Sequence, residues 1–336
     1  MKNYKLNLQL FAELNTNVTT ATASGNDLSP EMKTFYDKVL LREAQANLVH
    51  DQFGQKRNIP KNGGKNIEFR KFDSLPKAMT PLTEGVTPDG NKLNVTTVNA
   101  TVEQFGDYIV QSDVLELTSI DNTIVEATRI LGNQAGLTLD AIVRNKITAN
   151  ASAYYSADAD GTRPTLPTAM TAGCKFTVDD VKRGAALLKR FNTPKIEGYY
   201  VAIIHPDVSF DLTNDPAWVD VQKYATPENM LTGEIGKIHG VRFVESTEAL
   251  VEMGGADGKL PVYSTLMFGN DAYGTTSVDG GGLEVIVKQK GSAGTADPLN
   301  QRSSVGWKGL KIAEILVEQY IIRFVSASSL EGGKAN

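Results

Sequence analysis

Apolar residues recur at helical spacing from Asp121 to about Ala149, a stretch that contains no proline. They stand three, four or five positions apart, whereas the apolar residues of a half-buried strand would alternate with polar ones. The spacing therefore predicts one long helix, roughly 40 Å long at a rise of ~1.5 Å per residue. Its expected apolar stripe consists of Ile124, Ala127, Leu131, Ala135, Leu139, Ile142 and Ile147.

The sequence also indicates where this helix can begin and where another segment can approach it. Asp121 or Ser119 can cap its start, because a short polar side chain accepts a hydrogen bond from a free backbone N–H group. Gly132 and Gly136 each cost about 1 kcal/mol relative to alanine in a helix, so we expect another segment to pack closely there. A long helix with a narrow stripe fits a helix lying across a sheet, and it fits a core helix of an ordinary enzyme about as well.

Before the long helix, the pattern predicts an arm and a shorter helix. Residues 12–29 are rich in Thr, Asn, Ala and Ser and offer few groups to bury, so we expect an arm that only a neighbouring molecule would order. Ser29 as the cap and Pro30 at the first helical position predict the start of a helix. We expect that helix to end near residues 52–54, with Gly54 as a left-handed cap.

A long hairpin is expected between the two helices. Strand patterns cover Ile67 to Phe72 and Val95 to Val110. The segment between them, Ser74 to Leu93, carries three prolines and two glycines and cannot form a packed core. Because an isolated two-stranded hairpin is marginally stable in water, a long projecting one implies a partner surface.

After the long helix, residues 151–173 are polar and interrupted by proline, and a second globular region begins near Cys174. A helix should open at Thr177. Tyr199 to Ile204 is a nearly continuous apolar run, which is typical of a strand buried on both faces. Further strands are expected at Val241–Val244, Val262–Phe268 and Leu283–Val287, and a β-rich segment, Lys311 to Val325, should return to the first region.

Composition narrows the class of protein. The 336 residues are 41% apolar and 22% charged, with a formal net charge of −5 and no basic block, which disfavours a protein whose main task is to grip nucleic acid. Cys174 is the only cysteine, so neither an intrachain disulfide nor a thiolate metal cluster can form. Asn7 and Gln9 interrupt the apolar run near the N-terminus, and no segment approaches the ~20 apolar residues of a membrane helix. We therefore expect a soluble, cytoplasmic chain without membrane contact.

Three histidines are the candidate catalytic groups. His50, His205 and His239 are not spaced to share a metal ion. His205 follows the predicted buried strand and could act as a base at a strand end. A turn histidine bonded to the backbone explains it better, because no nucleophile stands at a recognisable elbow. We therefore expect no catalytic residue.

Metal and phosphate motifs are incomplete. Residues 158–161 look like the start of a calcium loop, but Ala169 stands where its glutamate is needed. Asn91 replaces the lysine of a phosphate loop in residues 85–92, and residues 254–259 are one residue too short. Gly280–Gly282 opens no helix. We therefore expect turns at these places, and no metal, cofactor or cofactor-binding residue.

Several segments together resemble the major capsid proteins of tailed bacteriophages. The principal one is Tyr199-Tyr200-Val201-Ala202-Ile203-Ile204-His205-Pro206-Asp207-Val208, with Asp211-Leu212 after it. Others are Phe35–Leu41, Asn47–Arg57, Ile67–Arg70, Pro81–Val86, Gly106–Tyr108, Gly240–Phe243 and Trp307-Lys308. The resemblance covers residues 30 to 326, and the combination is specific although each piece alone is weak.

The resemblance implies an α+β fold shared by tailed-phage capsids and encapsulin compartments. It implies an N-terminal arm (1–29), an N-terminal helix segment (30–60) and an extended β-hairpin loop (61–111). A peripheral domain with the long helix on a sheet (112–173 and 300–330) and an inserted axial domain (174–299) complete it. Only about thirty residues precede the first helix, which suggests a separate scaffolding protein rather than a long fused segment.

The function implied is a structural one. We expect the chain to self-assemble into pentamers and hexamers that form an icosahedral shell around phage double-stranded DNA, bound non-specifically. A portal would be a further partner, and assembly would take place in the host bacterial cytoplasm. An encapsulin-like protein nanocompartment is the alternative, and a soluble hydrolase using His205 is a third class.

Overall fold

The computed structural model describes residues 38–44, 47–58, 65–72, 75–87, 90–119, 123–224, 235–255, 258–276, 283–292, 297–330 and 333–336. The predicted arm and the predicted helix start at Ser29 and Pro30 lie outside these residues. The described chain falls into two compact units. Compact unit 1 takes its residues from Met1–Ala44, Gly106–Gln134 and Glu284–Lys308, and compact unit 2 from Gln45–Phe105, Ala135–Leu283 and Gly309–Asn336.

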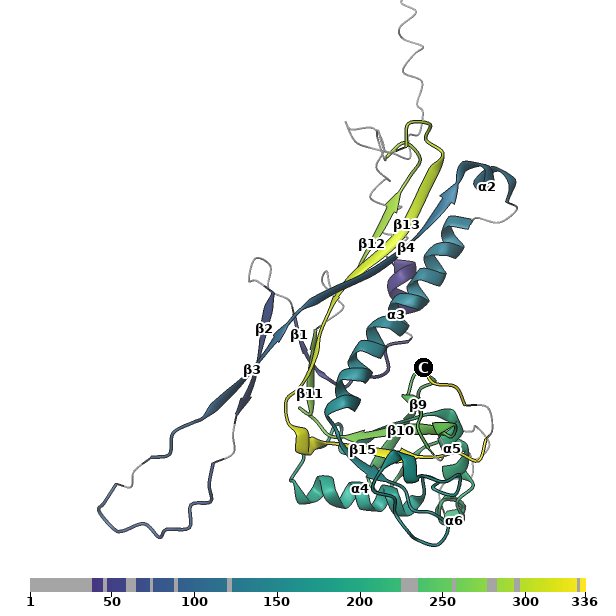
Figure 1. Ribbon diagram of the computed structural model, residues 1–336. Coiled ribbons are helices and arrows are strands. Elements are labelled where there is room, and N and C mark those ends of the chain that lie inside the picture. Colours follow the sequence, from purple (N-terminus) through teal and green to yellow (C-terminus); the bar gives the residue numbers. More distant parts are fainter. Residues whose placement is uncertain are drawn as a thin grey trace, which may run out of the picture. The chain divides into compact units, whose positions relative to one another are not determined.

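A seven-stranded mixed sheet organises compact unit 2 (Figure 1). Its order is β5-β15-β10-β6-β8-β7, and β9 also pairs with β10. β15 pairs in parallel with β5 and antiparallel with β10. β15 therefore pairs with one strand that precedes residue 174 and one that follows it, and residue 174 is where the predicted axial domain begins. The strands are β5 (Ser152–Tyr155), β6 (Tyr200–Ile204), β7 (Lys237–Ile238), β8 (Val241–Glu245), β9 (Val251–Met253), β10 (Pro261–Phe268) and β15 (Ile321–Ser326).

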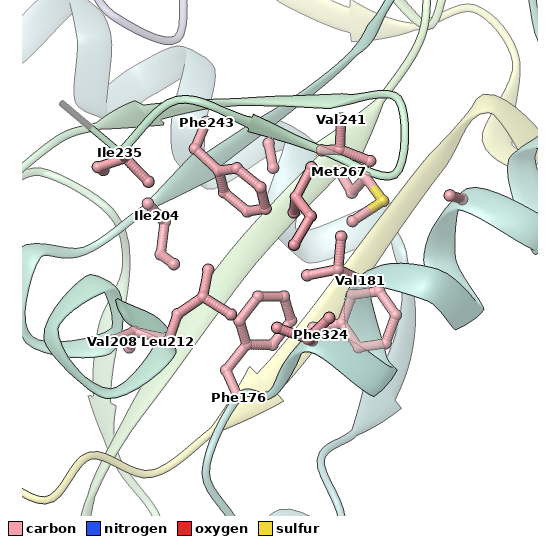
Figure 2. Packing of buried hydrophobic residues seen from close by; sticks show 14 of the residues in the cluster. Phe176, Val181, Ile204, Val208, Leu212, Ile235, Val241, Phe243, Met267 and Phe324 are labelled. Atoms are coloured by element: carbon pink, nitrogen blue, oxygen red, sulfur yellow. The ribbon is translucent and has the colours of Figure 1, made fainter. Parts of the chain in front are cut away.

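Strand β6 is buried at all five positions, as its apolar run predicts. Tyr200, Ala202 and Ile204 face a core that Figure 2 shows from close by. That core is completed by three helices, α4 (Val178–Arg190), α5 (Pro206–Thr213) and α6 (Pro216–Tyr224). Val201 and Ile203 face a second core on the opposite side, which includes Val143 and Ile147. Alternating residues of one strand thus serve two apolar layers.

The long helix is confirmed as α3 (Thr123–Asn150). Five of the expected stripe residues are buried, and the buried row runs at a strict spacing of four: Ala127, Leu131, Ala135, Leu139, Val143 and Ile147. Ile142, which was expected in the stripe, is only half-buried, and Val143 takes its place. A spacing of four on a helix of 3.6 residues per turn advances the buried row by about 40° at each step. This rotation carries the buried row slowly around the helix, so Val143 and not Ile142 continues it.

Compact unit 1 contains the first part of α3 and most of a three-stranded sheet, β12-β13-β4. The strands are β4 (Glu103–Ser112), β12 (Leu283–Lys288) and β13 (Arg302–Lys311). A helical segment at residues 38–44 packs against α3. A Cβ atom at Gly132 would lie 3.0 Å from the carbonyl oxygen of Leu40, which confirms the close approach expected at this glycine.

A short helix, α2 (Asp113–Thr118), was not expected from the sequence. Its N-cap is Ser112, whose hydroxyl accepts a hydrogen bond from Leu115 N–H at 3.3 Å. Ser119, expected as a cap of the long helix, is instead the C-cap of α2.

The predicted hairpin is present in compact unit 2 but is shorter than expected. β2 (Asn66–Phe72) pairs antiparallel with β3 (Val95–Thr101). The expected second strand, Val95–Val110, is divided at Val102, and β4 belongs to the β12-β13-β4 sheet. Ile67 and Phe69 are buried with Ala100 and Leu316 at the base of the hairpin. The base therefore has a core, whereas the described residues of the loop beyond it are all exposed.

The first predicted helix ends earlier than expected. Residues 47 and 49–53 form turns instead of continuing the helix to residue 52. Gly54 is not in a left-handed conformation. A Cβ atom there would lie 2.2 Å from Cγ2 of Thr275, so close packing is the reason for this glycine. These turns lead into a small sheet, β1-β11-β14, formed by β1 (Gln55–Arg57), β11 (Tyr273–Thr276) and β14 (Ala313–Ile315). Two short 3-10 helices lie at Pro167–Ala169 and Glu318–Tyr320.

Candidate functional site: capped turns, a buried polar cluster and exposed apolar surfaces

His205 caps helix α5. Its Nδ1 accepts a hydrogen bond from the Asp207 backbone N–H at 3.2 Å, and its ring packs on Tyr263 with the centroids 5.0 Å apart. Burial lowers the pKa of His205, although nearby carboxylates act in the opposite direction. The neutral imidazole is the form that can accept this bond, so the side chain holds the turn into α5, as the sequence predicts.

The same turn is tied to strand β10. The Tyr263 hydroxyl donates a hydrogen bond to Asp207 Oδ2 at 2.6 Å. Burial, together with this bond to a carboxylate, raises the pKa of Tyr263. The groups around His205 therefore form hydrogen bonds that join α5 to the sheet.

The calcium-like segment is a hydrogen-bonded loop. Asp158 accepts hydrogen bonds from the Thr171 hydroxyl at 2.9 Å and from the Ala159 backbone N–H at 2.8 Å. Gly161 takes a left-handed conformation, with φ of 78°, and its N–H donates to the Asp158 carbonyl. Among the described residues, no three His, Cys, Asp or Glu side chains gather as metal ligands.

The glycine segments form turns where they are described. Gly85 and Gly258 have φ values of 78° and 67°, and the Val86 N–H donates to the Thr83 carbonyl across the turn. Residues 88–89, 256–257 and 280–282, which belong to the three phosphate-loop candidates, lie outside the described residues.

A cluster of buried polar residues was not found from the sequence. Lys311 and Asp51 are each 1% exposed, and the Lys311 amine forms an ion pair with Asp51 Oδ1. The amine also donates to Thr275 Oγ1 at 3.1 Å and to the Thr276 carbonyl at 2.8 Å. Burial lowers the pKa of Lys311, while the Asp51 carboxylate acts in the opposite direction. All three donor directions of the ammonium group are thus satisfied.

The cluster continues into helix α3. Asp140 accepts hydrogen bonds from the backbone N–H groups of His50 and Asp51 at 2.7 and 3.2 Å. The ring Nδ1 of His50 lies 2.7 Å from the second oxygen of Asp140. The Tyr273 hydroxyl donates to the His50 carbonyl, and burial raises the pKa of Tyr273 well above its usual value. Turn 49–53 is therefore held by α3, β11 and β13 together.

The loop beyond the β2–β3 hairpin exposes apolar side chains. None of its described residues, 75–87 and 90–94, is in a strand (Figure 1). Met79 and Leu82 are 81% and 78% exposed. Leu75, Val86 and Leu93 are also more than half exposed. An exposed set of this kind is typical of an interaction surface.

A second exposed apolar set lies in compact unit 1. Val114 and Leu117 on α2 are 63% and 81% exposed, and Tyr108 on β4 is 68% exposed. Gly106 and Gly306 allow β4 and β13 to approach closely, since a Cβ at Gly106 would lie 2.5 Å from the Trp307 carbonyl oxygen. The described part of the chain thus carries two sets of exposed apolar side chains, one on the hairpin loop and one on α2 and β4.

The capsid resemblance is borne out by comparison with known families. A family model described as phage capsid protein matches residues 95–320. The chain belongs to the phage capsid protein family. This membership confirms the resemblance found in the sequence, and it makes the chain a structural shell protein of the virion. No curated protein is similar enough in sequence to count as a relative.

Solved capsids share the fold of this phage capsid protein. The capsid of Ralstonia phage GP4 gives a TM-score of 0.62 at 13% identity, over 85% of this chain and 90% of that one. The Cyanophage Pam1 capsid gives 0.61 at 13% identity, over 98% and 100%. The capsid of Cyanophage P-SCSP1u gives 0.60 at 15% identity, over 93% and 94%. The predicted α+β capsid fold is therefore confirmed. In the described part of the chain, no helix is long and apolar enough to cross a membrane.

Proposed function

We propose that this phage capsid protein assembles into pentamers and hexamers, and that these form an icosahedral shell enclosing double-stranded DNA. The supporting observation is the hairpin loop, whose apolar side chains stay exposed in the single chain. Burying them against a neighbouring copy would remove that apolar area from water, and symmetry would repeat the contact around each capsomer.

The net charge of the chain is compatible with DNA that must later be released from the shell. A formal net charge of −5 offers no excess of cations to release counterions from packaged DNA, so contact with the DNA would be weak and non-specific. We propose a separate scaffolding protein and a portal as further partners, and assembly in the host bacterial cytoplasm.

The division of the chain stays a proposal. We assign residues 1–29 to an arm, 30–60 to a helix segment and 61–111 to the extended loop. Residues 112–173 and 300–330 would form the peripheral domain, and 174–299 the axial domain. Limited proteolysis of free subunits tests this division, because cleavage should fall at the boundaries near residues 61, 112 and 174.

Electron microscopy of the purified full chain, alone and with phage scaffolding and portal proteins co-expressed, tests the assembly itself. Closed shells with five- and six-coordinated capsomers, together with nuclease-protected DNA in phage particles, would support the proposal. Shells that enclose a protein cargo and no DNA would instead support a nanocompartment. A chain that stays monomeric under all these conditions would contradict both.

A further inference from the structure

The buried pair Lys311–Asp51 brings an amine and a carboxyl group into contact inside compact unit 2. Lys311 ends β13, and Asp51 lies in the turn before β1, so the two residues are far apart in the sequence. Each is 1% exposed. Among the described residues, the carboxylate that contacts the Lys311 amine is that of Asp51. The site therefore excludes bulk water and presents one nucleophile to one acyl group.

The surroundings provide a path for a proton. The Thr275 hydroxyl accepts a hydrogen bond from Lys311 Nζ at 3.1 Å and donates one to Asp51 Oδ1. A proton that leaves the ammonium group can therefore reach the carboxylate through this hydroxyl. Asp140 acts as a positioning residue, because it accepts a hydrogen bond from the Asp51 backbone N–H at 3.2 Å and fixes the turn that carries Asp51.

We propose that Lys311 and Asp51 condense to an intrachain isopeptide bond. The Lys311 nitrogen forms a bond to Cγ of Asp51, and the bond from Cγ to one carboxyl oxygen breaks. Two of the three ammonium protons leave with that oxygen as water, and the third stays on the amide nitrogen. The step needs no oxidant, reductant or other reactant.

Two properties of the site favour this step. Burial lowers the pKa of Lys311, which raises the share of the neutral amine that can attack. Holding the two groups in contact makes the reaction intramolecular, which replaces the encounter of separate molecules. The product is a neutral amide, so it also removes two charges from a buried site.

Intact-mass spectrometry of the purified, folded full chain under denaturing conditions tests the proposal. We expect a mass lower than that of the sequence by one water molecule. A tryptic digest should yield one branched peptide that joins the segments around residues 51 and 311, with no cleavage after Lys311. The full sequence mass in folded protein would show an ion pair only and would overturn the proposal.

Matched variants assign the bond to these residues. Lys311→Arg keeps the cation but cannot form the amide, so it should restore the full mass. Lys308→Arg is the control, because Lys308 is partly exposed and pairs with Glu284 at 2.9 Å, and it should keep the deficit. If Lys311→Arg fails to fold, Asp51→Asn decides the question. Its condensation expels ammonia instead of water and gives a product with the same mass as the linked parent. An unlinked Asp51→Asn chain beside an unlinked parent would overturn the proposal.

Discussion

The seven-stranded sheet and the loop beyond the β2–β3 hairpin belong to one compact unit, and they treat apolar side chains in opposite ways. In the sheet, β6 buries its side chains in two cores, one on each face. In the loop, Met79 and Leu82 are about four-fifths exposed, at 81% and 78%. The sheet completes its core with residues of its own chain, whereas the described residues of the loop are all exposed.

This difference separates folding from assembly. The free energy of folding depends on contacts that the single chain makes, so it should be insensitive to the loop. The formation of shells depends on contacts that the single chain lacks, so it should be sensitive to the loop. Changes in the two regions should therefore affect different measurements.

Deleting residues 78–90 should give the largest effect. We expect no particles by negative-stain microscopy, because the apolar loop that would cover a neighbour is gone. The melting temperature of the free subunit should stay nearly unchanged, since the described residues of the loop lie outside the apolar cores. Replacing the same residues with a Gly/Ser segment of equal length is the control for chain length and should fail in the same way. Normal particles from either variant would contradict the comparison.

Phe324→Ala should destabilise the sheet strongly. Phe324 is fully buried on β15, with ring centroids 5.6 Å from Phe176 and 6.0 Å from Tyr154. Removing the ring leaves a cavity and should cost about 3–5 kcal/mol in the free energy of unfolding. Urea unfolding of free subunits measures this cost.

Leu82→Ala is the matched change in the loop. Leu82 is exposed, so its truncation should change the free energy of unfolding by less than about 0.5 kcal/mol and should lower the yield of particles instead. Equal destabilisation by Phe324→Ala and Leu82→Ala would show that the loop packs on its own chain.

His205→Asn should leave particle formation intact and change the free energy of unfolding by about 1 kcal/mol or less above pH ~7, because asparagine also caps helices well. The parent should show an additional pH dependence. Burial lowers the pKa of folded His205 below the unfolded value of 6.5, against the charges of Asp207, Glu245 and Glu248. The unfolded state then binds more protons, so this contribution to stability is complete above pH 6.5 and is lost as the pH falls through 6.5 toward the folded pKa.

The direction of this pH dependence is checked by unfolding the parent and His205→Asn from about pH 8 to pH 5 and comparing their free energies of unfolding. The parent should lose its advantage as the pH falls, and both proteins should form particles. A difference that stays constant over this range would show that His205 does not titrate differently on folding. A hydrolytic activity that the parent has and the well-folded variant lacks would support the enzyme alternative.

Much of the fold follows from local sequence patterns. The apolar run at residues 199–204 predicted β6, and helical spacing predicted α3. The helix expected to open at Thr177 is α4 (Val178–Arg190), with Thr177 as its N-cap. The predicted ends of helices and strands were least accurate where tertiary packing determines where an element stops. The helix at residues 38–44 ends before the expected position near residue 52 because Asp140 holds the backbone N–H groups of His50 and Asp51 in a turn.

The buried polar cluster could not be predicted in the same way. Lys311, Asp51 and Asp140 come from segments that only the tertiary fold brings together, and each looks like an ordinary surface residue in the sequence. One signal was present. Val305, Trp307 and Lys311 are separated by even numbers of positions on β13, so their side chains share one face of the strand. All three are buried, so this face carries a lysine among apolar residues.

Strand β15 also governs when a newly made chain can fold. It lies between β5 and β10, and its Ile322 pairs with Ser152, which the ribosome has released long before. Until residues 321–326 emerge, β10 lacks the neighbour along most of its length and Phe324 is missing from the core. Pairing between such distant segments is slow compared with local pairing. A growing chain therefore cannot complete its sheet until residues 321–326 have emerged, and a chain that stops before them does not reach the folded state that a shell could accept.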